Sequence, residues 1–538
     1  YKGILDLFNI SYPMAKEGTF GFIDIENPEE AARILQEAKD PKSPMHERSH
    51  NMTDYGNALL RQRVRHGCNV HMYYGRTMGH GHLDKMNFEI IAYGMNFSPD
   101  HGYPEYAENI PSRYEWTSNT VSHNTVMVDR AGQLNTKYAG IPLGYEDGKN
   151  IKFIDAEDVK AYEQVSMYRR TLCLVDITPD KAYIVDFFRV AGGSRHEISF
   201  HGGEGEVKIK GVSLIDQPSG TLKGEDVPYG EVKGFQKGGG RKRGDGYSFL
   251  YDVRKSEVPT DYVELTYELK DTWGMLTDKN AKPYLKVYMP GRKHRTVIAK
   301  GKPPTNKIGN PKFLYYYLGE RKGNDLKSRF VSVYEPFLNE GFIRSAELSP
   351  VNNEKESFER GCVKITLLDG SVDYVIHSVD DVEMNINNIV TFQGRFGFLR
   401  VKDGKVKKAF MWRGSRLAYN GNTLLEMNKP FITGTVKDFQ KEISDEHWVD
   451  LVLEKPIDSL EDVIGRYVYI DGNDVGNAVY EILGVEKTRE PNTYRFNTAA
   501  SPVRGYVDDC DPSKGYIYRF GEGAKAEIPL YCERDFEE

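Results

Sequence analysis

The chain has 538 residues with 72 basic and 79 acidic side chains, which gives a formal net charge of −7 at pH 7. A chain of this length is expected to fold as two or three domains. The charge balance argues against nucleic acid as a bulk partner, because phosphate groups are attracted by a strongly basic surface that this sequence lacks. No stretch approaches the roughly twenty apolar residues that span a bilayer, so no membrane span is predicted.

The ends of the chain and its cysteines bear on the compartment. The first residue is Tyr1 rather than Met and no signal peptide opens the chain, so we expect a processed product. The five cysteines are too few for a disulfide scaffold, and their odd number leaves at least one unpaired. A Cys510–Cys532 pair is possible and would indicate an oxidising compartment. We therefore expect a secreted protein, extracellular or periplasmic.

The first fifty residues contain one helix candidate. Residues 28–38 begin with a proline and follow Asn27, a residue type that caps helix N-termini. Residues 40–44 contain two prolines and are typical of a turn or linker. This part of the chain is therefore expected to precede the main domain rather than to form one.

From residue 51 onward the pattern is that of strands. Residues 70–74, 125–128 and 181–188 alternate between apolar and polar side chains. Turn signals of the Asp-Gly or Gly-Gly type recur between such runs, and few long helical periods interrupt them. We predict a mainly β fold whose central domain, residues 51–412, is a large antiparallel β-sandwich.

Two later regions stand apart from this central domain. Residues 238–246 are rich in glycine and basic side chains, but they lack the ending of a phosphate-binding loop and are interpreted as an exposed loop. Residues 413–538 continue as strands, but the spacing of the alternating runs changes, and they are predicted to form an appended C-terminal β domain. Alternating runs in this domain occur at residues 430–436, 448–453, 465–470 and 478–483.

Three histidines and a carboxylate recur within about forty residues. His82, Asp100 and His123 offer two nitrogen ligands and one oxygen ligand, a set that suits zinc. His80 lies two residues before His82, so an extended strand would place both on one face, with one facing a cleft. Spacing alone does not separate a metal site from scattered structural histidines.

Five pieces of this region resemble the heparinase II/III family of polysaccharide lyases in their order and approximate spacing. A weaker similarity continues through residues 196–201, whereas the clear one covers residues 51 to about 130. The five pieces are Asp-Tyr-Gly-Asn-Ala-Leu-Leu-Arg at 54–61, Tyr-Gly at 74–75, Gly-His-Gly-His-Leu-Asp at 79–84, Asp-x-Gly-Tyr at 100–103 and Ser-His-Asn-Thr-Val at 122–126.

The resemblance implies roles for these residues. His80 corresponds to a catalytic histidine, and His82, Asp100 and His123 correspond to the ligands of a zinc ion that is usually structural. The family also implies an N-terminal α/α toroid that supplies further catalytic groups. Only one helix is visible here, so we expect the toroid to be absent from this chain or to lie on a separate piece. Residues 1–50 would then be a remnant or linker.

Each of the other candidate residues has a plainer alternative. His80 could instead be hydrogen-bonded within a β core. Asp84 could orient an imidazole as an outer carboxylate or cap a turn. Tyr103 could act as an acid, form a subsite wall or simply pack. Arg76 could pair with a substrate carboxylate or with a surface carboxylate. His201, on a strand, is interpreted as structural.

The implied reaction is β-elimination of a uronate-containing polysaccharide. Elimination requires that the C6 carboxylate be neutralised, that a base remove the C5 proton and that an acid protonate the departing O4. We expect alginate as the first substrate, then heparin, heparan sulfate and other glycosaminoglycans. Two alternatives remain open: a uronyl C5-epimerase, which makes no double bond, and a non-catalytic carbohydrate-binding module.

Overall fold

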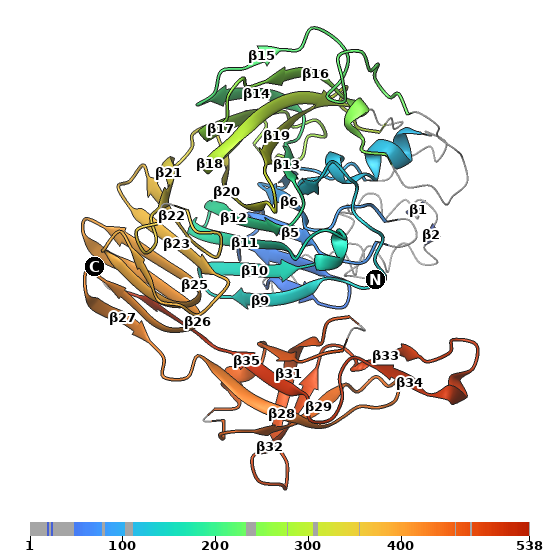
Figure 1. The fold of residues 1–538 in the computed structure, drawn as a ribbon. Helices are drawn as coiled ribbons and strands as arrows, with labels where there is room; N and C mark the ends of the chain where they lie inside the picture. The colour runs from blue at the N-terminus through green and yellow to red at the C-terminus, as the bar shows by residue number, and fades with distance from the viewer. Residues whose placement is uncertain are drawn as a thin grey trace.

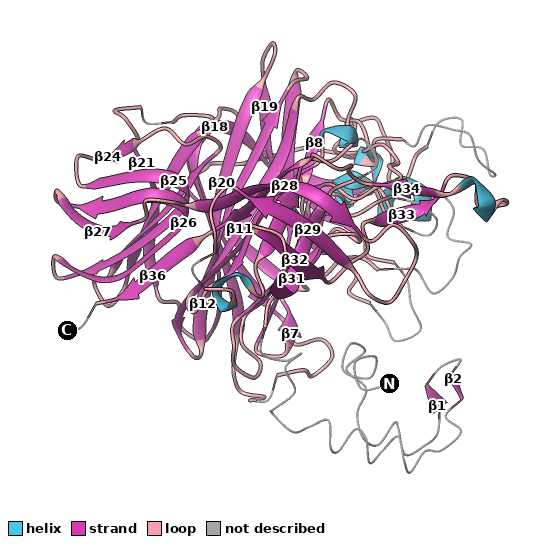
Figure 2. Ribbon diagram, turned by 90° about the horizontal axis from the view of Figure 1, so that it is seen from below, coloured by secondary structure: helices cyan, strands magenta, loops and turns pink. Residues whose placement is uncertain are grey.

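The structure is a computed structural model, and it describes residues 19–20, 23–24, 48–77, 81–102, 111–232, 244–276, 278–304, 310–354, 356–457, 459–473 and 476–536. The helix predicted at 28–38 and most of the glycine-rich segment at 238–246 lie outside these residues. Strands dominate the described chain and pair in antiparallel fashion (Figure 2), so the predicted mainly β fold is confirmed. No helix in this part of the chain has the length and apolar character needed to cross a bilayer.

Three sheets pack against one another to form the body of the molecule (Figure 1). A five-stranded sheet contains β3 (His50–Met52), β4 (Asn57–Arg61), β5 (Asn69–Tyr73), β6 (Asn87–Ala92) and β7 (Met95–Asn96). The middle sheet contains β8 (Val126–Val128), β9 (Ile141–Asp147), β10 (Ile151–Glu157), β11 (Met167–Thr178), β12 (Lys181–Ala191), β13 (Arg195–His201), β14 (Gly205–Lys210), β15 (Ile215–Asp216), β16 (Leu250–Lys255), β17 (Thr260–Leu269), β18 (Pro283–Gly301), β19 (Leu314–Lys322) and β20 (Lys327–Leu338). The third sheet contains β21 (Ile343–Ser349), β22 (Arg360–Leu367), β23 (Val372–Ser378), β24 (Met384–Ile386), β25 (Val390–Lys402), β26 (Lys405–Tyr419), β27 (Asn422–Glu426) and β36 (Tyr531–Asp535).

The middle sheet is covered on both faces, as the burial of β12 shows. Successive side chains of a strand point to opposite faces. Ile184 and Phe188 enter the apolar core shared with the five-stranded sheet, whereas Val185 and Phe187 enter the core shared with the third sheet. Nearly every residue of β12 is therefore buried, and the strand has no solvent face. Each such apolar side chain contributes about 1.5–3 kcal/mol by leaving water.

A closed six-stranded barrel lies beneath the body in Figure 1. It is inserted between β27 and β36, because β36 returns to pair with β26 of the third sheet. The predicted boundary between residues 412 and 413 falls inside β26, and the barrel itself runs from Phe431 to Pro529. Its strands are β28 (Phe431–Phe439), β29 (Trp448–Leu453), β30 (Tyr467–Ile470), β31 (Val479–Lys487), β32 (Thr493–Thr498) and β35 (Lys525–Pro529), and a hairpin of β33 (Val503–Tyr506) and β34 (Tyr516–Tyr518) projects from it.

Buried contacts fix the barrel to the body. Asn477 donates from Nδ2 to the carbonyl oxygens of Thr53 at 2.9 Å and Gly140 at 3.1 Å. Tyr467 of the barrel packs its ring 5.0 Å from that of Tyr145 in β9, centroid to centroid, within the core shared with the five-stranded sheet. Buried amides need such partners, so these bonds specify one orientation of the barrel.

The cysteines do not pair in the structure, and the possible Cys510–Cys532 disulfide is therefore wrong. All five are free thiols. Cys532 lies on β36 in the third sheet, whereas Cys510 is exposed in the connection of the β33–β34 hairpin on the barrel. The two residues are close in sequence, but they belong to different units of the fold and do not pair.

Glu146 at the end of β9 faces the barrel and is poorly solvated. Its carboxylate lies 3.4 Å from the Arg466 guanidinium of the barrel, and its side chain is 12% exposed. Burial raises the pKa of Glu146 to about 7, because the attraction of Arg466 offsets only part of the desolvation. The folded state therefore holds a proton that the unfolded chain has lost between about pH 4.5 and 7, so this residue lowers stability as pH rises through that window.

Replacing Glu146 by Gln is expected to remove this pH dependence. Relative to wild type, the variant should gain up to about 3 kcal/mol in free energy of unfolding between pH 4.5 and 7.5. Denaturant unfolding at a series of pH values measures the difference. Glu442→Gln, an exposed change on the same barrel, is the control and should follow wild type. Parallel curves for Glu146→Gln and wild type would contradict the raised pKa.

Candidate functional site

Three separate connections carry the predicted ligands. His82 lies in the connection between β5 and β6, Asp100 follows β7, and His123 directly follows the short helix η3 (Thr120–Ser122). Residues 74–77 and 81–82 are not part of a strand, so the extended strand expected around His80 and His82 is not found at His82. His80 itself and Tyr103 lie outside the described residues.

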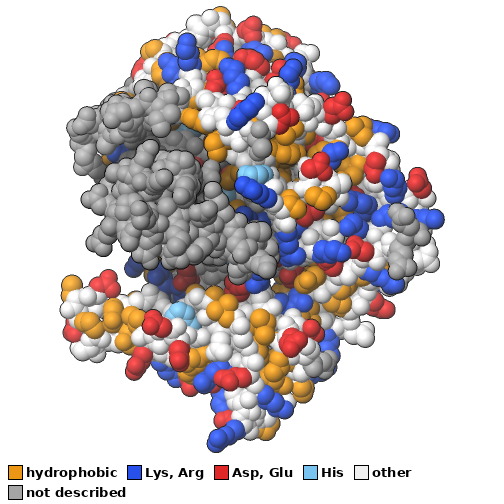
Figure 3. Space-filling view, turned by 180° about the vertical axis from the view of Figure 1, so that it is seen from behind, with side chains coloured by type: hydrophobic (Ala, Val, Ile, Leu, Met, Phe, Trp, Pro, Cys, Tyr) orange, Lys and Arg blue, Asp and Glu red, His pale blue; other side chains and the backbone are white. Residues whose placement is uncertain are grey.

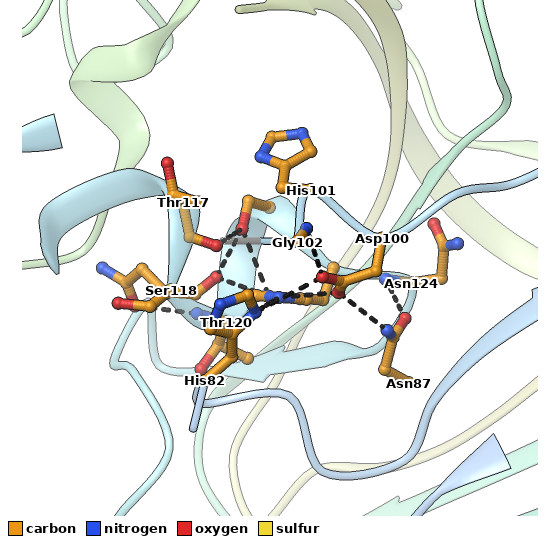
Figure 4. A network of polar contacts seen from close by, with 12 residues as sticks. His82, Asn87, Asp100, His101, Gly102, Thr117, Ser118, Thr120 and Asn124 are labelled. Carbon is orange, nitrogen blue, oxygen red and sulfur yellow. Dashed lines mark hydrogen bonds and ion pairs between the residues drawn. The ribbon is translucent and has the colours of Figure 1, made fainter. Parts of the chain in front are cut away.

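The fold brings the predicted ligands together (Figure 4). His82 Nδ1 lies 3.0 Å from His123 Nε2 and 3.4 Å from Asp100 Oδ1. His123 Nε2 lies 3.1 Å from Asp100 Oδ2. Two imidazole nitrogens that face each other at this distance cannot both present lone pairs without a proton or a cation between them. The arrangement therefore suits a shared positive ion.

Asp84 joins these three residues. One oxygen of Asp84 lies within 4.8 Å of the ligand atoms of His82, Asp100 and His123. Its Oδ1 is buried and has no hydrogen-bond partner among the described residues. An orphaned buried carboxylate oxygen is costly unless it meets a cation. The sequence suggested an outer carboxylate or a turn cap, whereas the geometry makes Asp84 a candidate fourth ligand.

The hydrogen bonds around the cluster hold its donors in place. His123 Nδ1 donates to the carbonyl oxygen of Asn119 at 2.8 Å, so Nε2 is the nitrogen left to face the cluster. Asp100 accepts from the backbone N–H of Gly102 at 2.7 Å and from Asn87 Nδ2 at 3.3 Å. Outer contacts of this kind are the usual supports of metal ligands.

Charge accumulates in this small space. Burial by itself raises the pKa of Asp100, but the neighbouring His123 and His82 hold the pKa of this carboxyl well below its usual range. Burial lowers the pKa of an imidazole, yet the pairing with Asp100 raises the pKa of His123. Burial raises the pKa of Asp84. Two crowded carboxylates and two imidazoles form a donor set that fits a divalent cation such as zinc.

A buried arginine beneath the site ties the ligand-bearing connections to the middle sheet. Arg170 on β11 donates to both carboxylate oxygens of Asp186 on β12, at 3.0 and 2.7 Å. Its third nitrogen donates to the carbonyl oxygens of Met86 and Asn124, both at 2.5 Å. Met86 follows the His82 connection and Asn124 follows His123, so one guanidinium positions both.

A second buried pair supports the same connections from the side. Lys85 forms an ion pair with Asp158 at 2.6 Å, and both side chains are buried. Gln133 holds the backbone of Lys85 with two hydrogen bonds. Gln133 Oε1 accepts from the Lys85 N–H at 2.7 Å, and Gln133 Nε2 donates to the Lys85 carbonyl oxygen at 2.9 Å. These positioning residues were missed in the sequence, because nothing in local spacing distinguishes Lys85 or Gln133 from surface polar residues.

A group of rings lies next to the cluster. His101 is buried, shares a hydrogen bond of 2.6 Å between its Nε2 and the Tyr316 hydroxyl, and packs 5.4 Å from Trp116, centroid to centroid. His201 stacks 4.8 Å from Tyr316 and bonds from its ring to the Gly202 carbonyl oxygen. Burial lowers the pKa of His201 to about 4, which agrees with its interpretation as structural. His101 was missed, although it directly follows Asp100.

Arg76 is exposed on the connection that leads to His82. No carboxylate in the described part of the chain forms an ion pair with it, so the plain surface salt bridge considered for Arg76 is not present there. Its backbone carbonyl accepts a hydrogen bond from the Tyr73 hydroxyl at 2.6 Å. The guanidinium is therefore available to a ligand.

Residues 69–234 match the family model described as heparinase II/III-like, C-terminal. The similarity to that family covers this segment, which is less than half of the chain. The segment contains His82, Asp84, Asp100 and His123, so the whole cluster lies within the matched part of the chain. The resemblance read from the histidine motifs is confirmed.

Individual relatives match over limited lengths. The exo-oligoalginate lyase of Saccharophagus degradans is 26% identical over 129 residues, which is 21% of this chain and 17% of that protein. Among solved structures, a heparinase III gene product gives a TM-score of 0.45 at 15% identity and covers 70% of this chain and 48% of its own. Heparan sulfate lyase HepC from Pedobacter heparinus gives 0.40 at 14% identity, with 70% and 47% covered. This chain thus spans about half the length of these solved structures.

Replacing His82 by Ala should remove one nitrogen ligand from the heparinase II/III-like segment and lower its bound metal. Elemental analysis of dialysed protein measures the metal content, and His66→Ala, an exposed histidine outside the matched segment, is the control. Asp84→Asn tests the fourth ligand and should weaken metal affinity by about 10–100-fold. Unchanged metal content in His82→Ala would contradict the ligand assignment.

Replacing Arg170 by Met should destabilise the protein by about 3–5 kcal/mol, because Asp186 would keep a buried charge without its partner. The free energy of unfolding measures the loss, and Arg489→Met, an exposed change on the barrel, should cost little. The double variant Arg170→Met/Asp186→Leu should recover part of the loss. A single variant as stable as wild type would show that Arg170 does not support the site.

Proposed function

We propose that this chain carries the β-sheet part of a polysaccharide lyase that cleaves a uronate-containing polysaccharide by β-elimination. The observation that carries the proposal is the cluster of His82, Asp84, Asp100 and His123, which lies within the family-matched segment. The cluster includes the second histidine of the Gly-His-Gly-His motif, and His80 is the first.

We propose zinc as the ion that the cluster holds. The ligands would be His82, Asp100 and His123, with Asp84 as the fourth group. The bound ion would supply positive charge that joins three connections, and its main role would be structural. Because the ligands come from separate connections, ion binding would also fix the segment that carries His80.

The reaction would proceed through this chain's side chains as follows. Arg76 would neutralise the C6 carboxylate of the uronate, since its planar fork matches a carboxylate. His80 would act as base or acid, with Tyr103 as the second proton-transfer group. The C5 proton goes to the base, the C4–O4 bond breaks with its electron pair on O4, and O4 gains a proton from the acid. A C4–C5 double bond remains in the new non-reducing end.

The substrate is proposed at two levels. A uronate polymer follows from the family of the matched segment, and alginate is favoured because the curated relative is an exo-oligoalginate lyase. Heparin and heparan sulfate come next. We further propose that an upstream α/α toroid completes the catalytic site and that the protein acts outside the cell or in the periplasm, where such polymers occur.

A lyase assay tests the function. The chain, alone and together with its upstream toroid region, is given alginate, heparin, heparan sulfate and chondroitin, and the unsaturated uronate is followed by ultraviolet absorbance. Activity on one polymer should fall by about 10²–10⁴-fold in His80→Ala, because a proton-transfer group is lost. His66→Ala, an exposed histidine, should retain it.

Other outcomes identify the alternatives. Exchange of the C5 proton with solvent without any rise in absorbance would indicate an epimerase. Binding of a polymer without either reaction, unaffected by His80→Ala, would indicate a carbohydrate-binding module. Either result would overturn the lyase assignment.

A further inference from the structure

Two segments run side by side just before the candidate site. Gly140 donates its N–H to the carbonyl oxygen of Tyr74 at 2.8 Å, and Thr77 donates its N–H to that of Thr136 at 3.0 Å. Thr136 returns a bond from its N–H to the Thr77 hydroxyl oxygen at 2.7 Å. Residues 74–77 and 136–140 are thus paired in antiparallel fashion. Arg76 on the first segment therefore lies across from residues 137–139 on the second.

The barrel reaches this pair of segments with a third cation. The Arg504 guanidinium on β33 lies 4.9 Å from the centre of the Tyr138 ring, and the Lys137 ammonium lies 5.6 Å from the same ring. Gly476 of the barrel also packs there, because a side chain at this position would lie 3.8 Å from Tyr138. Tyr138 therefore joins cations from the body and the barrel.

Neighbouring residues of the barrel dock on the body close to Tyr138. Asn477, next to Gly476, donates to the Gly140 carbonyl oxygen, which is two residues from Tyr138. Arg519, which is buried and pairs with Asp54 of the body, follows the end of β34 in the same hairpin. A cation held by such contacts loses little further freedom on binding a ligand.

Among the described residues, no carboxylate forms an ion pair with Arg76, Lys137 or Arg504. Arg76 and Lys137 are exposed and Arg504 is partly exposed. Other cations of the barrel are paired, including Arg495 with Asp450 and Lys441 with Asp438. In the described part of the chain, cations without a carboxylate partner therefore gather around Tyr138 and the segment that leads to His82.

Acidic and basic side chains are interspersed over the body and barrel in the view from behind (Figure 3), and the net charge of the chain is −7. An acidic polymer would be repelled overall, so its binding needs a local cationic element. Arg76, Lys137 and Arg504, here called the cationic strip, meet that need.

We propose that Lys137 and Arg504 of the cationic strip bind the anionic groups of the polysaccharide chain next to the residue being cleaved, so that the barrel supplies a subsite to the body. This inference rests on the proposed function for the identity of the ligand. Arg504 would contact a carboxylate or sulfate group one or more sugar units from the reaction, and Tyr138 would hold its guanidinium in place. Lys137 and Arg504 would act in binding and not in catalysis, whereas Arg76 keeps its proposed contact with the uronate that is cleaved.

The strip predicts a split in the kinetic constants. In Arg504→Ala the dissociation constant for a long polyuronate should rise about threefold, and in Arg504→Glu about tenfold, as expected for partly exposed charge pairs. The KM for long chains should rise in parallel, whereas kcat and the constants for the shortest cleavable oligosaccharide should stay unchanged. The effects should shrink as salt is raised.

The control is Arg489→Ala, which removes an exposed arginine from the β31–β32 turn of the same barrel. Lys137→Ala tests the strip from the body side, where barrel folding is not in question. Affinity electrophoresis in gels containing alginate or heparin measures binding without turnover, and thermal unfolding verifies that each variant is folded.

The outcomes separate the two proposals. If wild type cleaves a polymer but Arg504→Glu and Lys137→Ala bind it as Arg489→Ala does, the strip is refuted and the lyase function stands. If the Arg504 and Lys137 variants lose binding while wild type cleaves nothing, the strip stands and the lyase function is refuted. If wild type neither binds nor cleaves any of the polymers, both proposals are overturned.

Discussion

The candidate site depends on one buried guanidinium. Arg170 satisfies the carboxylate of Asp186 and the carbonyl oxygens of Met86 and Asn124, and its side chain is almost fully buried. A buried arginine is tolerated only when its donors are used in this way. Because the buried charge must keep all of these partners, the connections that carry His82 and His123 are both held next to the same residue of β11.

The three-layered body explains why such a constraint can hold. Strands such as β12 are enclosed on both faces, so the sheet beneath the site has little freedom to move. The connections above it are irregular and would otherwise be mobile. Hydrogen bonds made by the side chains of His123, Asn87 and Gln133 replace the backbone pairing that these connections lack. The site thus combines loop-borne chemistry with a rigid base.

The barrel adds a different property. In sequence the barrel lies between β27 and β36 of the third sheet. In space it docks on the body near Thr53 and Gly140. Its position brings Arg504 against Tyr138, on the segment that pairs with the connection leading to His82. The chain is mildly acidic overall, yet its fold gathers a local group of cations.

The sequence by itself determined the β class, the existence of a C-terminal β domain and the candidate group of His82, Asp100 and His123. Alternation and motif order carry that information, because both are local. Only the tertiary structure decided that Asp84 faces the same point, that Arg170 and Lys85 support it, and that the barrel is inserted between two strands of one sheet. The short sequence distance between Cys510 and Cys532 also suggested a disulfide that the fold does not form. Contacts between residues far apart in the chain are set by packing, which no local pattern records.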